Sequence, residues 1–354
     1  MWYTGIGTRE TQKGERKGGR GLGRTLNSPR RIVQQEVKGA VGIVSASHAG
    51  LLEVVSLLAR DGVPASQTIA VAGDDLSPQG GGEAMLAGLR ALQADAATEV
   101  IVLLSGLPST TAADQVLMQV RASDKPTVVC FLGSDQRLIW RAGAIPAARL
   151  DEAAMRAAAW VRGWDQALVS SRLKDFDEQW AALAADLRAE IGPGRDQLRG
   201  VFTGGLLCQE AQRMLAEVSG GQVQAAFLDL SVGRPSLAWP AARFDPAAQL
   251  RALREAWTDP HVALILLDVV LGHPALPDPA GALAGVLAEV PRREERDEPL
   301  VIARVCGQDP RQVADQEARL CAAGMVVMLS NAAAARLAGM ILAQRSASSL
   351  RPGR

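Results

Sequence analysis

The sequence predicts an α/β protein in which two parallel-sheet units follow one another along the chain. Two observations support this class. From Val41 onward, short and continuously apolar runs alternate with helical patterns. Such runs are typical of parallel strands whose two faces are both covered by helices. The same order of strand, small polar turn and helix then appears a second time after residue 197.

The first unit contains five apolar runs separated by amphipathic patterns. We expect strands at 41–45, 68–72, 100–104 and 127–132, with a fifth strand near Ile145. We expect helices at 51–60, 83–94, 111–122 and 150–161. This alternation indicates a sheet that is wound by crossover helices.

The second unit repeats the first in five segments that occur in the same order. The matched pairs are 198–221 with 40–62, 225–235 with 68–78, 261–273 with 98–108, 298–307 with 125–133, and 320–341 with 139–160. Five ordered matches are hard to produce by chance. They predict two flavodoxin-like domains in tandem.

The domain boundaries follow from this repeat. We place the first domain at 39–160, a helical linker at 161–197, the second domain at 198–343 and a flexible tail at 344–354. Residues 1–38 are rich in Gly, Arg and Lys and have few apolar side chains, so we expect them to be disordered. They are either a tail or a start assigned upstream of the domain. We expect Trp160, Trp164 and Trp180 to be packing anchors.

Composition excludes several classes of protein. The 354 residues carry 38 basic and 38 acidic side chains, and the body without its basic first segment is mildly acidic, which argues against a nucleic-acid partner. No apolar run reaches the ~18 residues of a membrane span, so we expect a cytoplasmic protein without a membrane partner. The four cysteines lack metal-binding spacing; we expect buried, reduced thiols and no metal.

In each domain the first strand ends in a turn of small residues that opens a helix. Unpaired backbone N–H groups and the helix dipole at such a position favour a bound anion. The candidate ligands are Ser45, Ser47, His48, Ala49 and Gly50 in the first domain, with Thr203, Gly204 and Gly205 in the second. The alternative is ordinary N-capping by Ser47 and Thr203. The matched positions of the two turns raise the expectation of a shared anion site.

Two histidines and an arginine are further candidates. His48 is a possible general base or phospho-acceptor, or else a hydrogen-bonding residue of its turn. His273 follows the most apolar strand, close to Asp268, where ligands of open α/β sheets bind. Arg234 also follows a strand and is a candidate anion ligand. The Gly-rich segment at 79–83 lacks the Gly-Lys-Ser/Thr of a P-loop.

A series of short segments along the chain, taken in order, resembles the FdrA family, a relative of the succinyl-CoA synthetases. The resemblance covers roughly residues 40–342 and rests on "VGIVSASHAGLLEVV", "VAGDDLSPQGGG", "TEVIVLLSGLP", "KPTVVCFLG", "LRGVFTGGLLCQEA", "SVGRP", "LILLDVVLGHPALPDPA" and "AGMVVMLSNAAAA". It implies that the first domain corresponds to an α-type ligase domain and the second to a β-type carboxy-terminal domain. It also implies that the helices after both turns point at one phosphorylated site.

The chain departs from that family at several positions. The phosphohistidine of the synthetases lies in a "GHAGAI"-type segment, whereas this chain reads "WRAGAI", with Arg141 at the histidine position. Ser47-His48-Ala49 replaces the usual Ser-Gly-Thr. We find no counterpart of the ATP-grasp domain, and residues 1–38 do not resemble the amino-terminal CoA-binding domain. Acyl-CoA ligation by this chain alone is therefore not expected.

The resemblance implies a subunit of a multi-subunit enzyme, either related to acyl-CoA ligases or a carbamoyltransferase of oxamate and allantoin catabolism. Phosphate, carbamoyl phosphate or CoA would be its ligand, and Arg141 would clamp the anion. Partner subunits or a homo-oligomer and a small-molecule substrate are the expected partners. The alternative is a catalytically degenerate paralogue that acts as scaffold or regulator of a partner enzyme.

Overall fold

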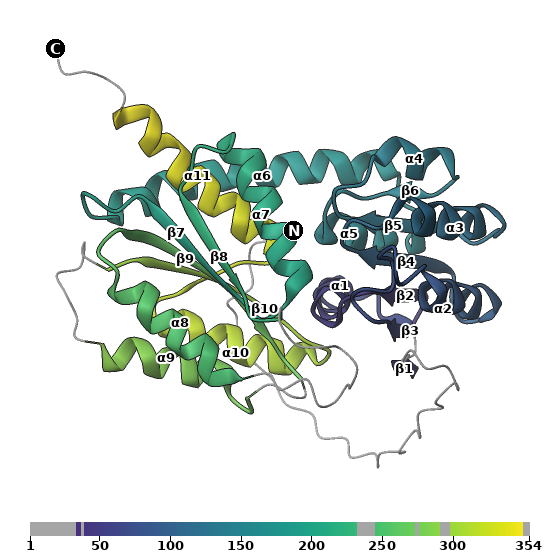
Figure 1. The fold of residues 1–354 in the computed structure, drawn as a ribbon, viewed down its shortest axis with the longest axis horizontal. Helices are drawn as coiled ribbons and strands as arrows, with labels where there is room; N and C mark the ends of the chain where they lie inside the picture. Colours follow the sequence, from purple (N-terminus) through teal and green to yellow (C-terminus); the bar gives the residue numbers. More distant parts are fainter. Residues whose placement is uncertain (1–32, 37–38, 232–244, 273–275, 291–297, 350–354) are drawn as a thin grey trace.

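A computed structural model describes residues 33–36, 39–231, 245–272, 276–290 and 298–349 (Figure 1). The chain forms two parallel β-sheets, each covered by helices on both faces. A long helix, α6 (Gln166–Glu190), connects them. The predicted class, two tandem flavodoxin-like α/β domains, is confirmed.

The first sheet has the strand order β1-β3-β2-β4-β5-β6. Its strands are β1 (Val33–Glu36), β2 (Val41–Ser45), β3 (Ala65–Ala70), β4 (Val100–Ser105), β5 (Thr127–Phe131) and β6 (Ile145–Pro146). All neighbours pair in parallel except β1, which runs antiparallel to β3. The continuously apolar β2, β4 and β5 are buried along their whole length, as expected for strands covered on both faces.

The second sheet has the order β11-β10-β9-β7-β8 and is parallel throughout. Its strands are β7 (Gln197–Phe202), β8 (Ala225–Asp229), β9 (Val262–Val270), β10 (Leu300–Cys306) and β11 (Val326–Val327). Without β1, both sheets place the second strand of the unit at one edge, followed by the first, third, fourth and fifth. The repeat found in the sequence is therefore a repeat of topology.

The helices follow the same plan in both units. The first unit contains α1 (His48–Arg60), α2 (Glu83–Ala94), α3 (Thr110–Arg121), α4 (Gln136–Arg141) and α5 (Leu150–Val161). The second contains α7 (Gly205–Ser219), α8 (Pro246–Thr258), α9 (Pro279–Glu289), α10 (Pro310–Ala322) and α11 (Asn331–Ser349). The short α4 had not been expected from the sequence.

The two units share one hydrophobic core. It contains strand residues of both sheets, such as Val41 and Leu104 in the first and Leu264 and Ile302 in the second. The helices α1, α5, α7 and α11 lie between the sheets (Figure 1). The outer faces have separate cores, one beneath α2, α3 and α4 and one beneath α8, α9 and α10. The inner helices therefore hold the units together.

Several expectations about single segments were wrong. Residues 33–36, inside the segment expected to be disordered, form β1 and pair with β3. Trp180 is a buried packing anchor, but the side chains of Trp160 and Trp164 are 47% and 39% exposed. Cys321 is exposed, whereas the three other cysteines are buried and free as expected.

Two kinds of feature are absent from the described residues. No helix there combines the length and apolarity needed to cross a membrane. In the same part of the chain, no three His, Cys, Asp or Glu side chains are arranged so that they could hold a metal ion.

Candidate functional site

The first turn, residues 45–50, bonds mainly to itself and to its own sheet. The Ser47 Oγ accepts the Gly50 N–H at 3.2 Å and thereby caps α1, so the predicted N-cap is confirmed. The Ser45 Oγ accepts the Ser47 N–H and donates to the Ser47 carbonyl. The Ala46 N–H donates to the Leu104 carbonyl at 2.9 Å. Much of the predicted anion-binding capacity of this turn is used locally.

The second turn, residues 203–205, binds a carboxylate of the chain itself. Asp268 of β9 is fully buried, and its Oδ1 accepts the N–H of Thr203 at 2.7 Å and the Thr203 hydroxyl at 3.1 Å. Its Oδ2 accepts the Gly204 N–H at 2.7 Å. Burial raises the pKa of Asp268 to about 7, although these hydrogen bonds lower it. Thr203 is therefore not the N-cap; Gly204 is, and Asp268 supplies the anion.

A second carboxylate lies beside Gly205. A Cβ added at this glycine would lie 2.6 Å from the Ser231 Oγ and 3.1 Å from the Asp229 Oδ2. Asp229 also accepts the backbone and hydroxyl hydrogens of Ser231. Two aspartates thus surround the start of α7. A cavity of about 10 Å³ beside Thr203 is water-sized, and its other lining residues come from α8, β9 and α9 and from Leu276, not from the first turn.

The two turns contact each other, and we call this contact the turn junction. A Cβ added to Gly204 would overlap the Ala49 Cβ, and one added to Gly50 would lie 2.5 Å from the Leu206 Cδ2. The first turns of α1 and α7 are therefore adjacent, in agreement with what the family resemblance implies. Glycine fits at 204 because any side chain there would overlap the Ala49 methyl group, whereas the atom that faces Gly50 is the end of the Leu206 side chain.

Gly204→Ala tests this contact and is expected to destabilise the protein by about 1–3 kcal/mol through overpacking. Adding Ala49→Gly removes the opposing methyl group and should restore much of the loss in a double-mutant cycle. Gly285→Ala is the control, because a Cβ there meets nothing and alanine favours a helix. Additive effects of the first two substitutions in urea unfolding would show that the turns do not touch.

His48 is the first residue of α1 and lies at the turn junction beside Ala49. Its side chain is half-buried, and burial lowers its pKa below the usual value of 6.5. The imidazole is therefore neutral at pH 7 and offers one donor and one acceptor. His48 stays a candidate for proton transfer at this position.

Arg141 is not at the junction, and its predicted role as an anion clamp is wrong. It is the exposed last residue of α4, which packs through Ile139 and Ala142 on the outer face of the first sheet. The first turn follows β2. In the sheet, β2 and β6 are three strand positions apart, which corresponds to about 14 Å. Moreover, Arg141 precedes β6 and so lies toward the amino edge of the sheet, whereas the turn lies at the carboxyl edge.

The "RAGAI" segment forms the end of α4 and leads into β6. Gly143 (φ +80°) ends α4, and its N–H donates to the Trp140 carbonyl. In the second unit Gly324 (φ +85°) ends α10 in the same way, bonded to Cys321. The segment is thus a repeated helix end with a left-handed glycine, and the counterpart of Arg141 is Ala322.

Three further residues named in the sequence analysis remain: Arg234, His273 and Asp75. Arg234 and His273 lie outside the described residues. Asp75, next to the Gly-rich segment, is buried, and its two oxygens accept the N–H groups of Ala84 and Met85 at 3.1 and 2.9 Å. It therefore caps α2, and that helix start also has an anion from the chain itself.

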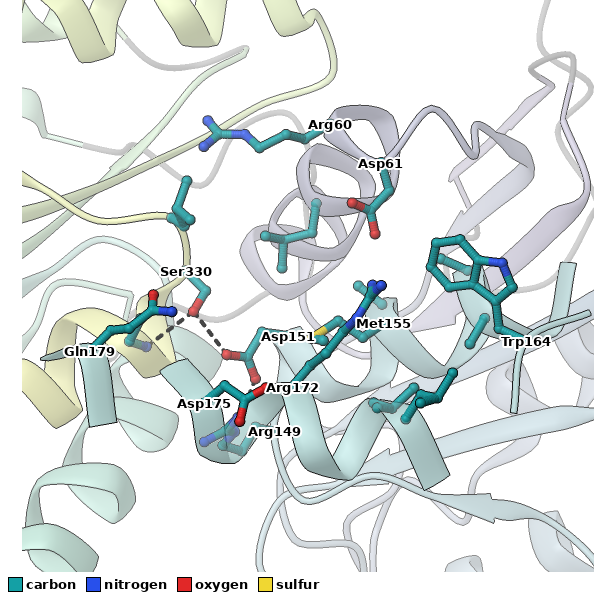
Figure 2. Close-up of a pocket in the computed structure, with 18 of the residues that line it drawn as sticks. Arg60, Asp61, Arg149, Asp151, Met155, Trp164, Arg172, Asp175, Gln179 and Ser330 are labelled. Carbon is teal, nitrogen blue, oxygen red and sulfur yellow. Dashed lines mark hydrogen bonds and ion pairs between the residues drawn. The ribbon is translucent and has the colours of Figure 1, made fainter. Parts of the chain in front are cut away.

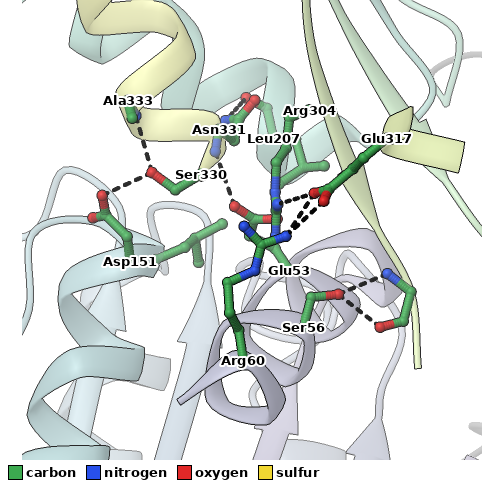
Figure 3. A network of polar contacts seen from close by, with 12 residues as sticks. Glu53, Ser56, Arg60, Asp151, Leu207, Arg304, Glu317, Ser330, Asn331 and Ala333 are labelled. Atoms are coloured by element: carbon green, nitrogen blue, oxygen red, sulfur yellow. Dashed lines mark hydrogen bonds and ion pairs between the residues drawn. The ribbon is translucent and has the colours of Figure 1, made fainter. Parts of the chain in front are cut away.

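Two buried glutamates that the sequence reasoning missed, Glu53 and Glu210, join the units reciprocally; Glu53 and Asn331 are labelled in Figure 3. Glu53 is the sixth residue of α1, and its Oε1 accepts the N–H of Asn331, the first residue of α11, at 2.9 Å. Glu210 is the sixth residue of α7, and its Oε1 accepts the N–H of Leu150, the first residue of α5, at 2.7 Å. Each unit thus caps the last helix of the other. We call this pair the glutamate clasp.

Asn331 connects the two halves of the clasp. Its Nδ2 donates to the Glu210 Oε2 at 2.8 Å and to the Leu207 carbonyl at 2.9 Å. Burial raises the pKa of Glu210 to about 8, with the nearby charge of Asp151 adding to this effect. Burial also raises the pKa of Glu53, although Arg304 opposes the shift.

Arg304 of β10 is fully buried and neutralises Glu53 across the unit boundary. Its Nε lies 2.7 Å from the Glu53 Oε2, and its Nη1 lies 3.4 Å from the Glu317 Oε1. Arg60 of α1 also pairs with Glu317, at 2.7 Å. The Ser56 hydroxyl completes the contact by bonding both the N–H and the carbonyl of Gly307 (Figure 3).

A signal for the clasp was present in the sequence. Glu53 interrupts the apolar run "LLEVVSLL", and Glu210 occupies the same position in the matched helix of the second unit. A charged side chain on an apolar helix face, repeated in both units, indicates a buried polar contact. Arg304 similarly interrupts the apolar strand "LVIARVC".

Comparison with known proteins finds similarity for the second unit and for the chain as a whole. Residues 201–341 match the CoA-ligase family. Over 316 residues the chain is 31% identical to the uncharacterized protein YahF of Escherichia coli (strain K12). The alignment covers 83% of this chain and 60% of YahF, so the chain spans less than two thirds of that relative.

Two solved structures are among those to which the chain is similar. PH0766 from Pyrococcus horikoshii OT3 is 15% identical with a TM-score of 0.34, over 88% of this chain and 66% of that one. The dinucleotide-forming acetyl-coenzyme A synthetase 1 of Ca. Korarchaeum cryptofilum, solved with phosphate and ADP, is 13% identical with a TM-score of 0.33, over 90% and 68%.

Proposed function

From the CoA-ligase match of residues 201–341, we propose that the protein is an FdrA-like, acyl-CoA ligase-related subunit of a multi-subunit enzyme. One observation carries the proposal: a single chain holds two units of the same topology, and their first helices meet at the turn junction. Two helix starts in contact place two positive dipole ends beside one position. Such a position suits a phosphorylated or acyl-phosphate group.

The ligand that we propose for the junction is phosphate or carbamoyl phosphate, with CoA handled by the assembled enzyme. Asp268 competes with such an anion, because its carboxylate already accepts the Thr203 and Gly204 N–H groups. Its pKa of about 7 makes the competition pH-dependent. Anions should bind better below pH 7, where Asp268 is protonated and neutral.

Asp268→Asn tests the junction directly. The substitution removes the competing negative charge, so phosphate or carbamoyl phosphate should raise the melting temperature of the variant more than that of the wild type. Asp114→Asn, an exposed aspartate of α3, is the control. No stabilisation of the folded variant by either anion would overturn the junction as an anion site.

The activity is tested on the complex purified with its partner subunits. Oxamate-dependent phosphate release would identify a carbamoyltransferase, and CoA-dependent acyl ligation would identify a ligase. Partner subunits are part of this proposal, since Arg141, which takes the place of the synthetase phosphohistidine in the sequence, lies on another face of the first sheet.

A second candidate, a scaffold or regulator of a partner enzyme, is favoured by one specific observation. The N–H groups of Thr203 and Gly204 in turn two already donate to Asp268. In turn one, the N–H groups of Ser47 and Gly50 donate to serine hydroxyls of the same turn. A catalytically degenerate paralogue would keep this closed arrangement. A purified complex whose activity is unaffected by Asp268→Asn and by His48→Ala would support the scaffold.

A further inference from the structure

A cavity of about 550 Å³ lies between the two units, away from the turn junction (Figure 2). Its walls come from the end of α1, from α5 and α6, and from the start of α11, so both units and the connecting helix contribute. The volume falls within the range of small-molecule sites. Because α1 has 13 residues, the cavity is roughly 20 Å from the junction.

One wall of the cavity is apolar. It is formed by Leu57, Ala154, Met155, Ala158, Leu168 and Val169. Small alanines on α5 leave the space open, and the methionine is a side chain that adapts to different ligand shapes. This wall suits an aliphatic or aromatic body of modest size.

Four of the eight charged side chains that line the cavity form ion pairs within the described residues. Arg60 bonds to Glu317 at 2.7 Å, and Arg149 lies 3.0 Å from Asp151. Arg336 lies 3.3 Å from Glu217. The charges of these side chains are balanced within the protein, so they do not require a charged ligand.

Asp61 and Arg172 differ from these pairs. In Figure 2 the Asp61 carboxylate and the Arg172 guanidinium both point into the space beside Met155 and Trp164. Arg172 stacks on the Trp164 ring at 4.8 Å from its centroid. Burial raises the pKa of Asp61, although the charges of Arg162, Arg172 and Arg60 lower it. Arg162 donates to the Asp61 carbonyl and lies over the same Trp164 ring, at 4.7 Å from its centroid. Within the described residues the two side chains form no direct ion pair, and the Asp61 carboxylate accepts no hydrogen bond.

The opposite charges of Asp61 and Arg172, which both point into the cavity, decide which charges a ligand can carry. A simple anion at Arg172 would approach Asp61, and a simple cation at Asp61 would approach Arg172, so each would meet repulsion. A molecule that carries both charges side by side satisfies both groups. A carboxylate can accept two parallel hydrogen bonds from a guanidinium, and an ammonium group can donate to a carboxylate.

We propose that this cavity binds a small zwitterion, an apolar amino acid, with its ammonium at Asp61, its carboxylate at Arg172 and its side chain on the wall formed by Met155 and the alanines. Such a ligand touches the first unit, the linker and the start of α11 at once. Its binding would favour the arrangement in which the two units are closed on each other. The inference does not depend on the activity proposed for the junction.

The test is thermal unfolding of the full chain titrated with L-leucine, L-methionine or L-phenylalanine at millimolar concentration. At least one should raise the melting temperature in a saturable way. Isocaproate and isoamylamine, which each keep only one charge of leucine, should have a much smaller effect. Arg172→Gln and Asp61→Asn should each weaken binding by about tenfold or more.

Control and cavity-filling variants keep the result interpretable. Arg137→Gln and Asp114→Asn change exposed charges of the first unit and should leave binding unchanged. Ala158→Leu fills the cavity, keeps both charges and should abolish binding in a variant that stays folded by circular dichroism. The proposal is overturned if none of the three amino acids stabilises the wild type. It is equally overturned if isocaproate alone matches leucine, or if the folded Arg172→Gln and Asp61→Asn variants bind as tightly as the wild type.

Discussion

Replacing Arg304 by methionine is expected to lower the free energy of unfolding by about 3–5 kcal/mol. The substitution leaves Glu53 buried without its counter-charge, since the Arg304 Nε lies 2.7 Å from the Glu53 Oε2 and neither side chain reaches solvent. It also removes the link from β10 to α1, which belong to different units. Urea unfolding monitored by circular dichroism measures the loss.

The matched control is Arg319→Met, which removes two exposed ion pairs, one with Asp278 and one with Asp315 of the same helix. Such surface pairs contribute about 0–1 kcal/mol. Combining Arg304→Met with Glu53→Gln should recover part of the loss, because glutamine carries no charge and can still accept the Asn331 N–H. A loss no larger than that of Arg319→Met would mean that the pair does not join the units.

Glu210→Gln is expected to change how stability depends on pH. The folded state raises the pKa of Glu210 from 4.5 to about 8. Between these values the unfolded chain has released a proton that the folded chain still holds. Stability therefore falls with rising pH in this window, by about 1.4 kcal/mol per pH unit from this group. Above about pH 8 the contribution is constant.

The variant should therefore lose stability less steeply than the wild type between about pH 5 and pH 7. Absolute stability also changes, because the glutamine amide meets the Leu150 N–H or the Asn331 amide, so the comparison is made on slopes. Glu217→Gln, an exposed residue of the same helix, is the control and should leave the slope unchanged. Equal slopes for wild type and Glu210→Gln would show that Glu210 is ionised in the folded protein at neutral pH.

The helix starts explain why the anion site was only partly predictable. A strand followed by small residues and a helix indicates a position that favours negative charge, and this was read from both turns. The structure fills several such positions from the chain itself: Asp75 at α2, Asp268 beside α7, Glu210 at α5 and Glu53 at α11. The sequence showed which helix starts favour a negative charge, but it did not show which carboxylates of the chain occupy them.

The sequence by itself determined the strands, the matched units and the caps made by near neighbours. Continuous apolar runs such as 41–45 require helices on both faces of the strand. Ser47 caps α1 by accepting the N–H of Gly50, which is only three residues further along the chain. Only the tertiary structure decided which groups meet at the unit boundary. Asp268 is 64 residues from Gly204, and Glu53 is 278 from Asn331. Such contacts depend on how the two sheets pack, which no local pattern encodes.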